Sequence, residues 1–261
     1  MTLWVRFEAG GRIGFGTLAD GKIAVHAGDM FDGPTPTGDV LASDQAKLLM
    51  PSMPSKMICL WNNFHALSAK LGVAEPAEPL YLLKAPSSFM GPGGAIRRPR
   101  SYDGKIVYEG ELGIVIGRTL SDASEDEAQA GIFGYTCIND VTCADIISKD
   151  PTFPQWARAK SFDTFGIFGP AIATGLDPAS LTVRTILNGA ERQNYPISDM
   201  IFPAATLVAK LSADMTLLPG DVIACGTSLG VGAMKEPENT VEIVIDGIGT
   251  LANTLSNERG A

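Results

Sequence analysis

The sequence predicts a mixed, β-rich α+β fold built from one large domain and one small domain. Three observations support this prediction. The chain has 261 residues, which is about 1.7 times a typical domain of roughly 150 residues. Its 29 glycines and 17 prolines are scattered along the chain, a pattern typical of many turns. Strand-like runs outnumber helical ones, and the best helical pattern covers residues 203–211.

The composition excludes several classes of protein. With 20 basic and 29 acidic residues, the net charge is −9, which argues against binding to a nucleic-acid backbone. No apolar run approaches the roughly 18 residues that a membrane span needs. The N-terminus lacks a basic-then-apolar signal, and the four cysteines form no C-x-x-C pair, which favours reduced thiols. We therefore expect a cytoplasmic protein with no nucleic-acid or membrane partner.

Residues 1–55 are predicted to form a small N-terminal β-rich domain. An Asp-Gly pair at positions 20 and 21 lies between alternating runs and indicates a hairpin. Residues 31–38 predict a loop, and residues 40–50 predict a short helix. Two prolines then mark the boundary. The strands expected in this domain are residues 4–7, 13–17 and 22–26.

Residues 56–261 are predicted to form the catalytic domain. A strand at its start is followed by a helix over residues 62–71 that ends before Gly72. Residues 73–104 are rich in proline and predict a long irregular stretch, which in compact domains is usually functional. The strands expected in this domain are residues 56–60, 106–108, 112–116, 132–138, 167–173, 181–187 and 241–245.

The first candidate functional motif is Glu109-Gly110-Glu111. Because side chains alternate along a strand, both glutamates point to one face, with Cα atoms roughly 6.6 Å apart. Leu112 and Ile114 share the opposite face with Gly110, which indicates a core-facing side. Two adjacent acids repel each other unless a positive group lies between them. The motif therefore predicts either a metal site or an ordinary solvated strand face.

A second motif, Asn139-Asp140, follows another expected strand. Asp140 would supply a third oxygen ligand to the same site. Three carboxylates without clustered histidine or cysteine are typical of a hard cation, Mg²⁺ or Mn²⁺, with Ca²⁺ as an alternative. An Asx turn is an equally good explanation of Asn-Asp on its own.

Two further segments carry polar groups among apolar neighbours. Lys160 lies in such a segment, where a lysine usually extends to solvent but could also pair with the acids or hold a substrate carboxylate. Gly226-Thr227 opens a glycine-rich loop, whose backbone N–H groups can approach an anionic group. The loop lacks the lysine and spacing of a P-loop, so we exclude nucleotide binding.

In this order and spacing, the four segments resemble the fumarylacetoacetate hydrolase (FAH) family, including its acylpyruvate hydrolase and 2-hydroxyhepta-2,4-diene-1,7-dioate isomerase branches. The resemblance runs from about Lys56 to Leu251. The first 55 residues also resemble the small N-terminal domain of many members. The resemblance implies an FAH-type rolled β-sandwich catalytic domain and a homodimer.

The resemblance also implies roles for individual residues. It implies that the metal ligands are Glu109, Glu111 and Asp140, and that Lys160 is the active-site lysine. The substrate-binding residues that it implies are Thr227, Gly226 and Lys84. The last of these lies in a Lys-Ala-Pro-Ser-Ser stretch similar to the family's Lys-Pro-Ser-Ser.

The sequence departs from the family pattern at the lid over the metal. Hydrolytic members show Asn-Tyr-x-x-His-x-x-Glu there, and this chain has Leu67 at the histidine position and Lys70 at the glutamate position. His65 lies two residues earlier, about 200° around a helix. An arginine after the metal aspartate is also absent, and Gly-Thr-Pro has become Gly226-Thr227-Ser228. These changes affect water activation and the far end of the substrate.

Three hypotheses of function follow. The first is divalent-metal-dependent C–C bond hydrolysis of a 2-oxo or enol acid, acylpyruvate-like or β-diketone-like, through a metal-stabilised enolate. His65 or a metal-bound hydroxide would then replace the missing pair as base. The second is an isomerase or decarboxylase of a 2-hydroxy-dienedioate in aromatic compound catabolism, which needs no activated water. The third is a non-catalytic metal-binding relative.

Overall fold

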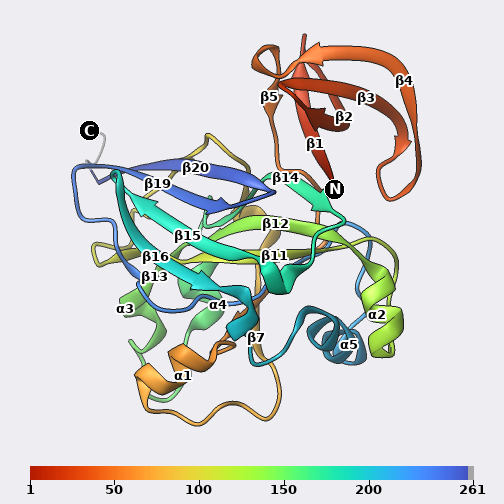
Figure 1. The fold of residues 1–261 in the computed structure, drawn as a ribbon. Coiled ribbons are helices and arrows are strands. Elements are labelled where there is room, and N and C mark those ends of the chain that lie inside the picture. Colours follow the sequence, from red (N-terminus) through yellow and green to blue (C-terminus); the bar gives the residue numbers. More distant parts are fainter. Residues whose placement is uncertain (258–261) are drawn as a thin grey trace.

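The computed structural model describes residues 1–257, and two packed β-sheets dominate it. Figure 1 shows the N-terminal strands as a lobe beside a larger body, in which the blue and cyan strands of the second sheet lie over the green strands of the first. Contacts between β11 or β12 and β15, β19 or β20 join the two sheets. The expected mixed, β-rich fold is confirmed.

The N-terminal lobe is an antiparallel meander. The predicted hairpin is confirmed, because Asp20 and Gly21 both have positive φ values (48° and 70°) between two paired strands. Three further residue pairs, from Thr2↔Thr174 to Trp4↔Ile172, attach the lobe to the larger sheet. Its strands are β1 (Thr2–Ala9), β2 (Arg12–Ala19), β3 (Lys22–Asp29), β4 (Asp32–Ala42) and β5 (Lys47–Leu48).

Two predictions in this lobe were wrong. Residues 31–38, expected as a loop, lie mostly in β4, and residues 40–50, expected as a helix, hold the end of β4, a 3₁₀ turn (Ser43–Gln45) and β5. β4 is the edge strand of the sheet and pairs with β3 through an irregular register. An edge strand tolerates Pro34 and Pro36, because no further strand needs their missing N–H groups. The prediction of a separate domain over residues 1–55 stays a prediction.

The larger sheet continues from the lobe in the order β1-β14-β12-β11-β17-β6-β7. Short strands extend it or form a small three-stranded sheet at its end. The strands of this region are β6 (Met57–Trp61), β7 (Leu80–Lys84), β8 (Phe89–Met90), β10 (Ile106–Tyr108), β11 (Gly110–Ile116), β12 (Ile132–Asp140), β13 (Thr142–Cys143), β14 (Gly166–Thr174), β17 (Val222–Ala224) and β18 (Gly232–Ala233).

The second sheet has the order β16-β15-β19-β20-β9. Its strands are β9 (Ala95–Ile96), β15 (Thr182–Leu187), β16 (Ala190–Pro196), β19 (Glu238–Ile245) and β20 (Gly249–Ser256). Leu112, Ile114 and Ile116 of β11 are fully buried in the main apolar core, together with Val183, Ile243 and Leu251 of this sheet. The core-facing side predicted for β11 is therefore confirmed.

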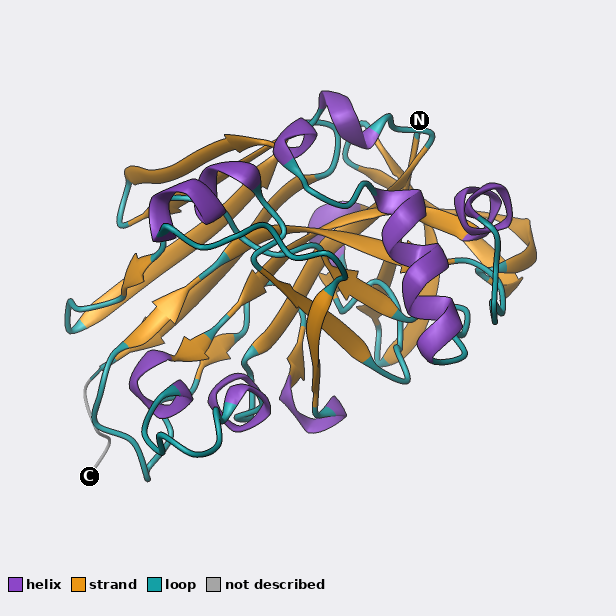
Figure 2. Ribbon diagram, turned by 90° about the horizontal axis from the view of Figure 1, so that it is seen from below, coloured by secondary structure: helices purple, strands orange, loops and turns teal. Residues whose placement is uncertain are grey.

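The helices are short and lie around the sheets (Figure 2). They are α1 (His65–Leu71), α2 (Glu125–Gly131), α3 (Ala144–Ile147), α4 (Trp156–Lys160) and α5 (Ala204–Asp214). The predicted end of α1 is confirmed, because Gly72 adopts the left-handed conformation (φ 65°) that glycine allows. Within residues 1–257, no helix is long and apolar enough to cross a membrane.

Candidate metal and substrate site

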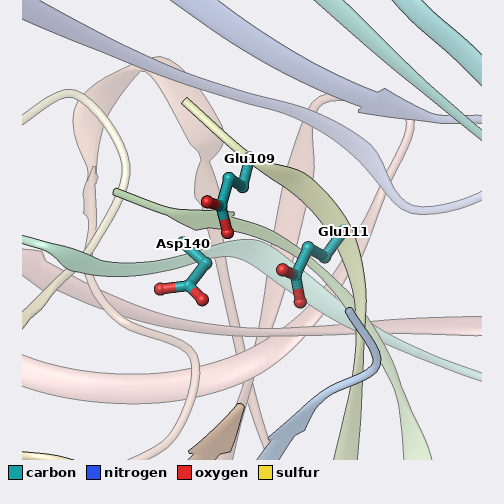
Figure 3. A group of neighbouring side chains, drawn as sticks. All are labelled: Glu109, Glu111 and Asp140. Carbon is teal, nitrogen blue, oxygen red and sulfur yellow. The ribbon is translucent and has the colours of Figure 1, made fainter. Parts of the chain in front are cut away.

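Two adjacent strands bring three carboxylates together. Glu109 precedes β11, Glu111 lies on it, and Asp140 ends β12; one ligand oxygen of each lies within 4.8 Å of the others. The register explains this convergence, because Glu111 is opposite Ile138, so Glu111 and Asp140 point to the same face. Figure 3 shows the three side chains turned toward one another. These are the three residues that the sequence selected as metal ligands.

Lys160, the last residue of α4, reaches the carboxylates from the side. Its Nζ lies 2.5 Å from Glu109 Oε2, 2.6 Å from Asp140 Oδ2 and 2.8 Å from Thr142 Oγ1. Burial opposes its charge, but Asp140, Glu109 and the third acid outweigh burial and raise the pKa of Lys160. Lys160 is therefore a protonated cation among the carboxylates and does not extend to solvent.

Asp140 also pairs with Lys84, whose Nζ lies 2.5 Å from Asp140 Oδ1. Burial pushes the pKa of Asp140 upward, but Lys160 and Lys84 more than offset burial and hold that pKa below its ordinary value. Asp140 is therefore ionised, and its two oxygens each have an ammonium neighbour.

Glu111 is the carboxylate with the weakest compensation. Only 1% of it is exposed, and its Oε2 accepts a hydrogen bond from the backbone N–H of Gly226 at 2.9 Å. Burial, and then the charge of Asp140, raise its pKa well above the ordinary value. Three carboxylates thus face two ammonium groups, which leaves a negative charge uncompensated. An all-oxygen donor set with this deficit fits a divalent hard cation such as Mg²⁺ or Mn²⁺.

The Gly226-Thr227 loop packs against the same motif. Thr227 Oγ1 donates to the carbonyl oxygen of Gly110 at 3.0 Å. Gln193 and Tyr195 of β16, which the sequence did not single out, also bind Gly110: its N–H donates to Gln193 Oε1 (3.0 Å), and Tyr195 OH donates to its carbonyl (2.6 Å). No element was predicted over residues 190–196, so no sequence signal marked these residues.

Of the remaining two predicted site residues, Lys84 pairs with Asp140, whereas His65 pairs with Glu75. Lys84 is buried and donates to the carbonyl oxygens of Lys160 and Phe165, at 2.7 Å each. The His65 side chain is half exposed at the start of α1, and its Nδ1 lies 2.6 Å from Glu75 Oε1. The roles assigned to both residues stay predictions.

Asn63, two residues before α1, links the helix to the site. Asn63 Nδ2 donates to the carbonyl oxygen of Cys225 at 2.9 Å, one residue before Gly226. Within residues 1–257, however, no hydrogen bond joins the His65 ring to a carboxylate of the triad. The helix therefore begins beside the Gly226-Thr227 loop, while its histidine is paired elsewhere.

Comparison with known proteins identifies the family. Residues 56–256 match the fumarylacetoacetate (FAA) hydrolase C-terminal family, and residues 3–51 match the Rv2993c-like N-terminal family. The chain belongs to the fumarylacetoacetate hydrolase family. Relatives include Protein Rv2993c of Mycobacterium tuberculosis, 42% identical over 90% of this chain and 86% of that protein. Oxaloacetate tautomerase YisK of Bacillus subtilis is 34% identical over 91% of this FAH-family chain and 84% of that protein.

Solved structures support the same assignment. A 2-hydroxyhepta-2,4-diene-1,7-dioate isomerase from Mycobacterium marinum matches with a TM-score of 0.89 and 37% identity, over 98% of each chain. A maleylpyruvate hydrolase from Sphingobium sp. SYK-6, in complex with manganese(II) and pyruvate, matches with a TM-score of 0.77 and 26% identity, over 98% of this chain and 99% of that chain. The named members of the family are thus enzymes with different reactions: tautomerase, isomerase and hydrolase.

Proposed function

We propose that this FAH-family chain is a divalent-metal-dependent enzyme that interconverts the keto and enol forms of a small 2-oxo acid of the oxaloacetate type. The observation that carries the proposal is the site itself: two buried carboxylates, the partly buried Glu109 and Lys160, with no imidazole hydrogen-bonded to them within residues 1–257. The likeness to an oxaloacetate tautomerase over 91% of the chain supports the same reaction.

The residues divide the work as follows. Glu109, Glu111 and Asp140 would hold Mg²⁺ or Mn²⁺. The bound cation would supply Lewis-acid stabilisation of negative charge on the oxygen of a 2-oxo acid. Lys160 would place a positive charge beside the same group, because its ammonium is already fixed between Glu109 and Asp140. Thr227 and Gly226 would orient the substrate from the loop.

Keto–enol isomerisation suits this site because it requires neither an activated water molecule nor the cleavage of a C–C bond. A proton passes from the carbon next to the keto group to water, and water supplies a proton to the oxygen, so no water is consumed and no bond between carbons breaks. Hydrolysis needs in addition a base that deprotonates water. A site in which no imidazole is hydrogen-bonded to the carboxylates, within the described residues, therefore favours the isomerisation.

C–C bond hydrolysis of an acylpyruvate-like or β-diketone-like acid is the second candidate. The pairing of His65 with Glu75 favours it, because a carboxylate that binds one imidazole nitrogen fixes the orientation of the ring. Isomerisation or decarboxylation of a 2-hydroxy-dienedioate would use the same carboxylates and the same lysine. These reactions differ in their products.

The test is an assay of the metal-stripped protein reloaded with Mg²⁺ or Mn²⁺. Added as the enol, oxaloacetate should lose its enol absorbance faster than in buffer that contains the same metal. Glu109→Gln should remove the acceleration, because it removes one carboxylate while keeping its shape. No acceleration in the reloaded wild type would overturn the proposal, and pyruvate released from an acylpyruvate would favour hydrolysis instead.

We also propose that the chain forms a homodimer and acts in the cytoplasm. The described residues leave Leu80, Tyr81 and Leu83 of β7 exposed at the edge of the larger sheet, and such an apolar edge strand favours pairing with another chain. Light scattering tests the mass, and Leu83→Glu should lower it to that of a monomer. The cytoplasmic assignment rests on four free, buried cysteines; labelling in cell fractions tests it.

A further inference from the structure

One buried glutamine connects β15 and the Gly226-Thr227 loop to the Glu109-Gly110-Glu111 motif. Gln193 is 1% exposed. Its Oε1 accepts from the N–H of Gly110 (3.0 Å) and from Thr185 Oγ1 (2.8 Å). Its Nε2 donates to Thr227 Oγ1 (2.8 Å) and to the carbonyl oxygen of Leu229 (3.2 Å). A side-chain amide offers two donors and two acceptor positions, so all its capacity is used within the protein.

Gly110 needs these side chains because a strand is missing beside it. On one side β11 pairs with β12 throughout, but on the other side β17 ends at Ala224, and the last backbone bond runs from the Cys225 N–H to Leu112. The N–H and C=O of Gly110 would therefore be unpaired and buried, which costs free energy. Gln193, Thr227 and Tyr195 take the place of the missing strand.

The second sheet approaches Gly110 so closely that a side chain at this position would clash with it. A Cβ on Gly110 would lie 2.1 Å from Thr185 Oγ1 and 3.2 Å from Gln193 Oε1. A Cβ on Gly230 would lie 2.1 Å from the carbonyl oxygen of Arg192. The strand, the loop and β16 thus meet at van der Waals distance around the amide of Gln193.

From this arrangement, we propose that Gln193 is the positioning residue of the metal centre. It fixes the peptide between the two glutamate ligands, and through Thr227 it fixes the loop whose Gly226 N–H holds Glu111. This inference rests on the proposed function, because it assumes that the carboxylates bind a divalent cation. Gln193 is assigned no direct role as a ligand, because its amide is bonded to protein groups at all four positions.

The test measures Mn²⁺ affinity by calorimetry and the EPR spectrum of bound Mn²⁺. Gln193→Met keeps most of the volume and removes all four hydrogen bonds. We expect the Kd for Mn²⁺ to rise about 10–100-fold and the EPR line shape to change, because the ligands lose their fixed geometry. Asn194→Met, on the exposed face of the same strand, is the matched control and should behave as wild type.

The outcomes distinguish failure of the role proposed for Gln193 from failure of the proposed metal centre. A folded Gln193→Met protein with wild-type affinity and line shape would overturn the inference. Normal Mn²⁺ binding by Glu109→Gln would instead overturn the metal centre, and with it the proposed function. If Gln193→Met does not fold, Thr185→Val decides: it removes one anchor of the Gln193 amide and nothing at the carboxylates, so we expect weaker Mn²⁺ binding, and an unchanged Kd would refute the role.

Discussion

Lys84 holds the main chain of Lys160: its Nζ donates to the Lys160 carbonyl oxygen at 2.7 Å. The same Nζ bonds to the carbonyl oxygen of Phe165 and pairs with Asp140. Lys84 is thus bonded to the main chain at the end of α4, the position from which the Lys160 side chain reaches the carboxylates. The two lysines have different surroundings, and we expect their substitution to have different effects.

Replacing Lys84 should mainly destabilise the protein. Lys84→Met removes one buried cation of Asp140 and the hydrogen bonds that Lys84 donates to three main-chain carbonyl oxygens, so we expect the free energy of unfolding to fall by about 3–5 kcal/mol. Urea unfolding followed by circular dichroism measures this change.

Lys56→Met is the matched control for Lys84→Met. Lys56 pairs with the buried Asp221 at 2.6 Å, but that carboxylate also accepts from Ser55 and Leu218. Asp221 keeps these donors when the lysine is removed, so the control should lose less than half as much stability. Equal losses of unfolding free energy in the two variants would contradict the prediction that Lys84 contributes more to stability than Lys56.

Replacing Glu111 should have opposite effects with and without metal. Its raised pKa means that ionised Glu111 destabilises the metal-free folded state, with burial as the main cause. Glu111→Gln removes this cost and keeps an oxygen for the Gly226 N–H, so the metal-free Tm should rise by about 2–4 °C for each kcal/mol removed.

With saturating Mn²⁺ the order should reverse. Wild type gains stability in proportion to the logarithm of metal concentration over Kd, and Glu111→Gln gains little because it lacks a ligand charge. Differential scanning calorimetry in EDTA and in Mn²⁺ measures both values. If the metal-free variant had a lower Tm than the metal-free wild type, ionised Glu111 would not destabilise the metal-free folded state.

The same pKa shift predicts the pH dependence of metal binding. Because the folded pKa of Glu111 lies above its ordinary value, the metal-free protein loses stability as pH rises from that ordinary value through the folded pKa. A bound divalent cation requires the ionised form, so its stabilisation grows over the same range. The Tm difference between Mn²⁺ and EDTA should therefore increase from pH 5 to pH 8.

Exposed acids provide an internal control in that experiment. Hydrogen bonds hold the pKa of Asp145, Asp150 and Glu127 below their ordinary values. These groups contribute stability that is lost at low pH, but they contribute equally with and without metal and cancel in the difference. A Tm difference that stays flat across the range would remove Glu111 from the metal centre.

Sequence patterns predicted the site where its geometry is local. Alternation along a strand placed Glu109 and Glu111 on one face, and a neighbouring strand end offered Asp140, while the resemblance to the FAH family implied that these three acids bind the metal. The bonds of Gly110 to Gln193 join residues 83 positions apart. A buried glutamine side chain needs hydrogen-bond partners, and no local sequence pattern indicates which residues those partners are.

The same reason explains the errors in the N-terminal lobe. Prolines argue against a strand interior, but β4 lies at a sheet edge, and its edge position depends on which strands pair elsewhere. The partner of His65 was also hidden, because Glu75 follows α1 in an irregular stretch and reaches the ring only in the folded chain.

His65 separates the two candidate reactions. If isomerisation proceeds through the carboxylates and Lys160, His65→Gln should leave the rate of enol oxaloacetate turnover within about twofold of wild type, since a general base contributes about 10²–10⁴-fold only where it takes part. Any hydrolysis of an acylpyruvate should fall by about that larger factor in the same variant.

The remaining histidine provides the control. His26 contacts Trp4 in the N-terminal lobe, with ring centroids 5.0 Å apart, so His26→Gln should change neither reaction. Glu75→Gln should reproduce the hydrolytic defect of His65→Gln in part, because the ring loses its carboxylate partner but keeps its nitrogen atoms. A hundredfold loss of isomerisation in His65→Gln, with normal folding and Mn²⁺ binding, would show that His65 takes part in the isomerisation. It would refute the prediction that the reaction proceeds without this histidine.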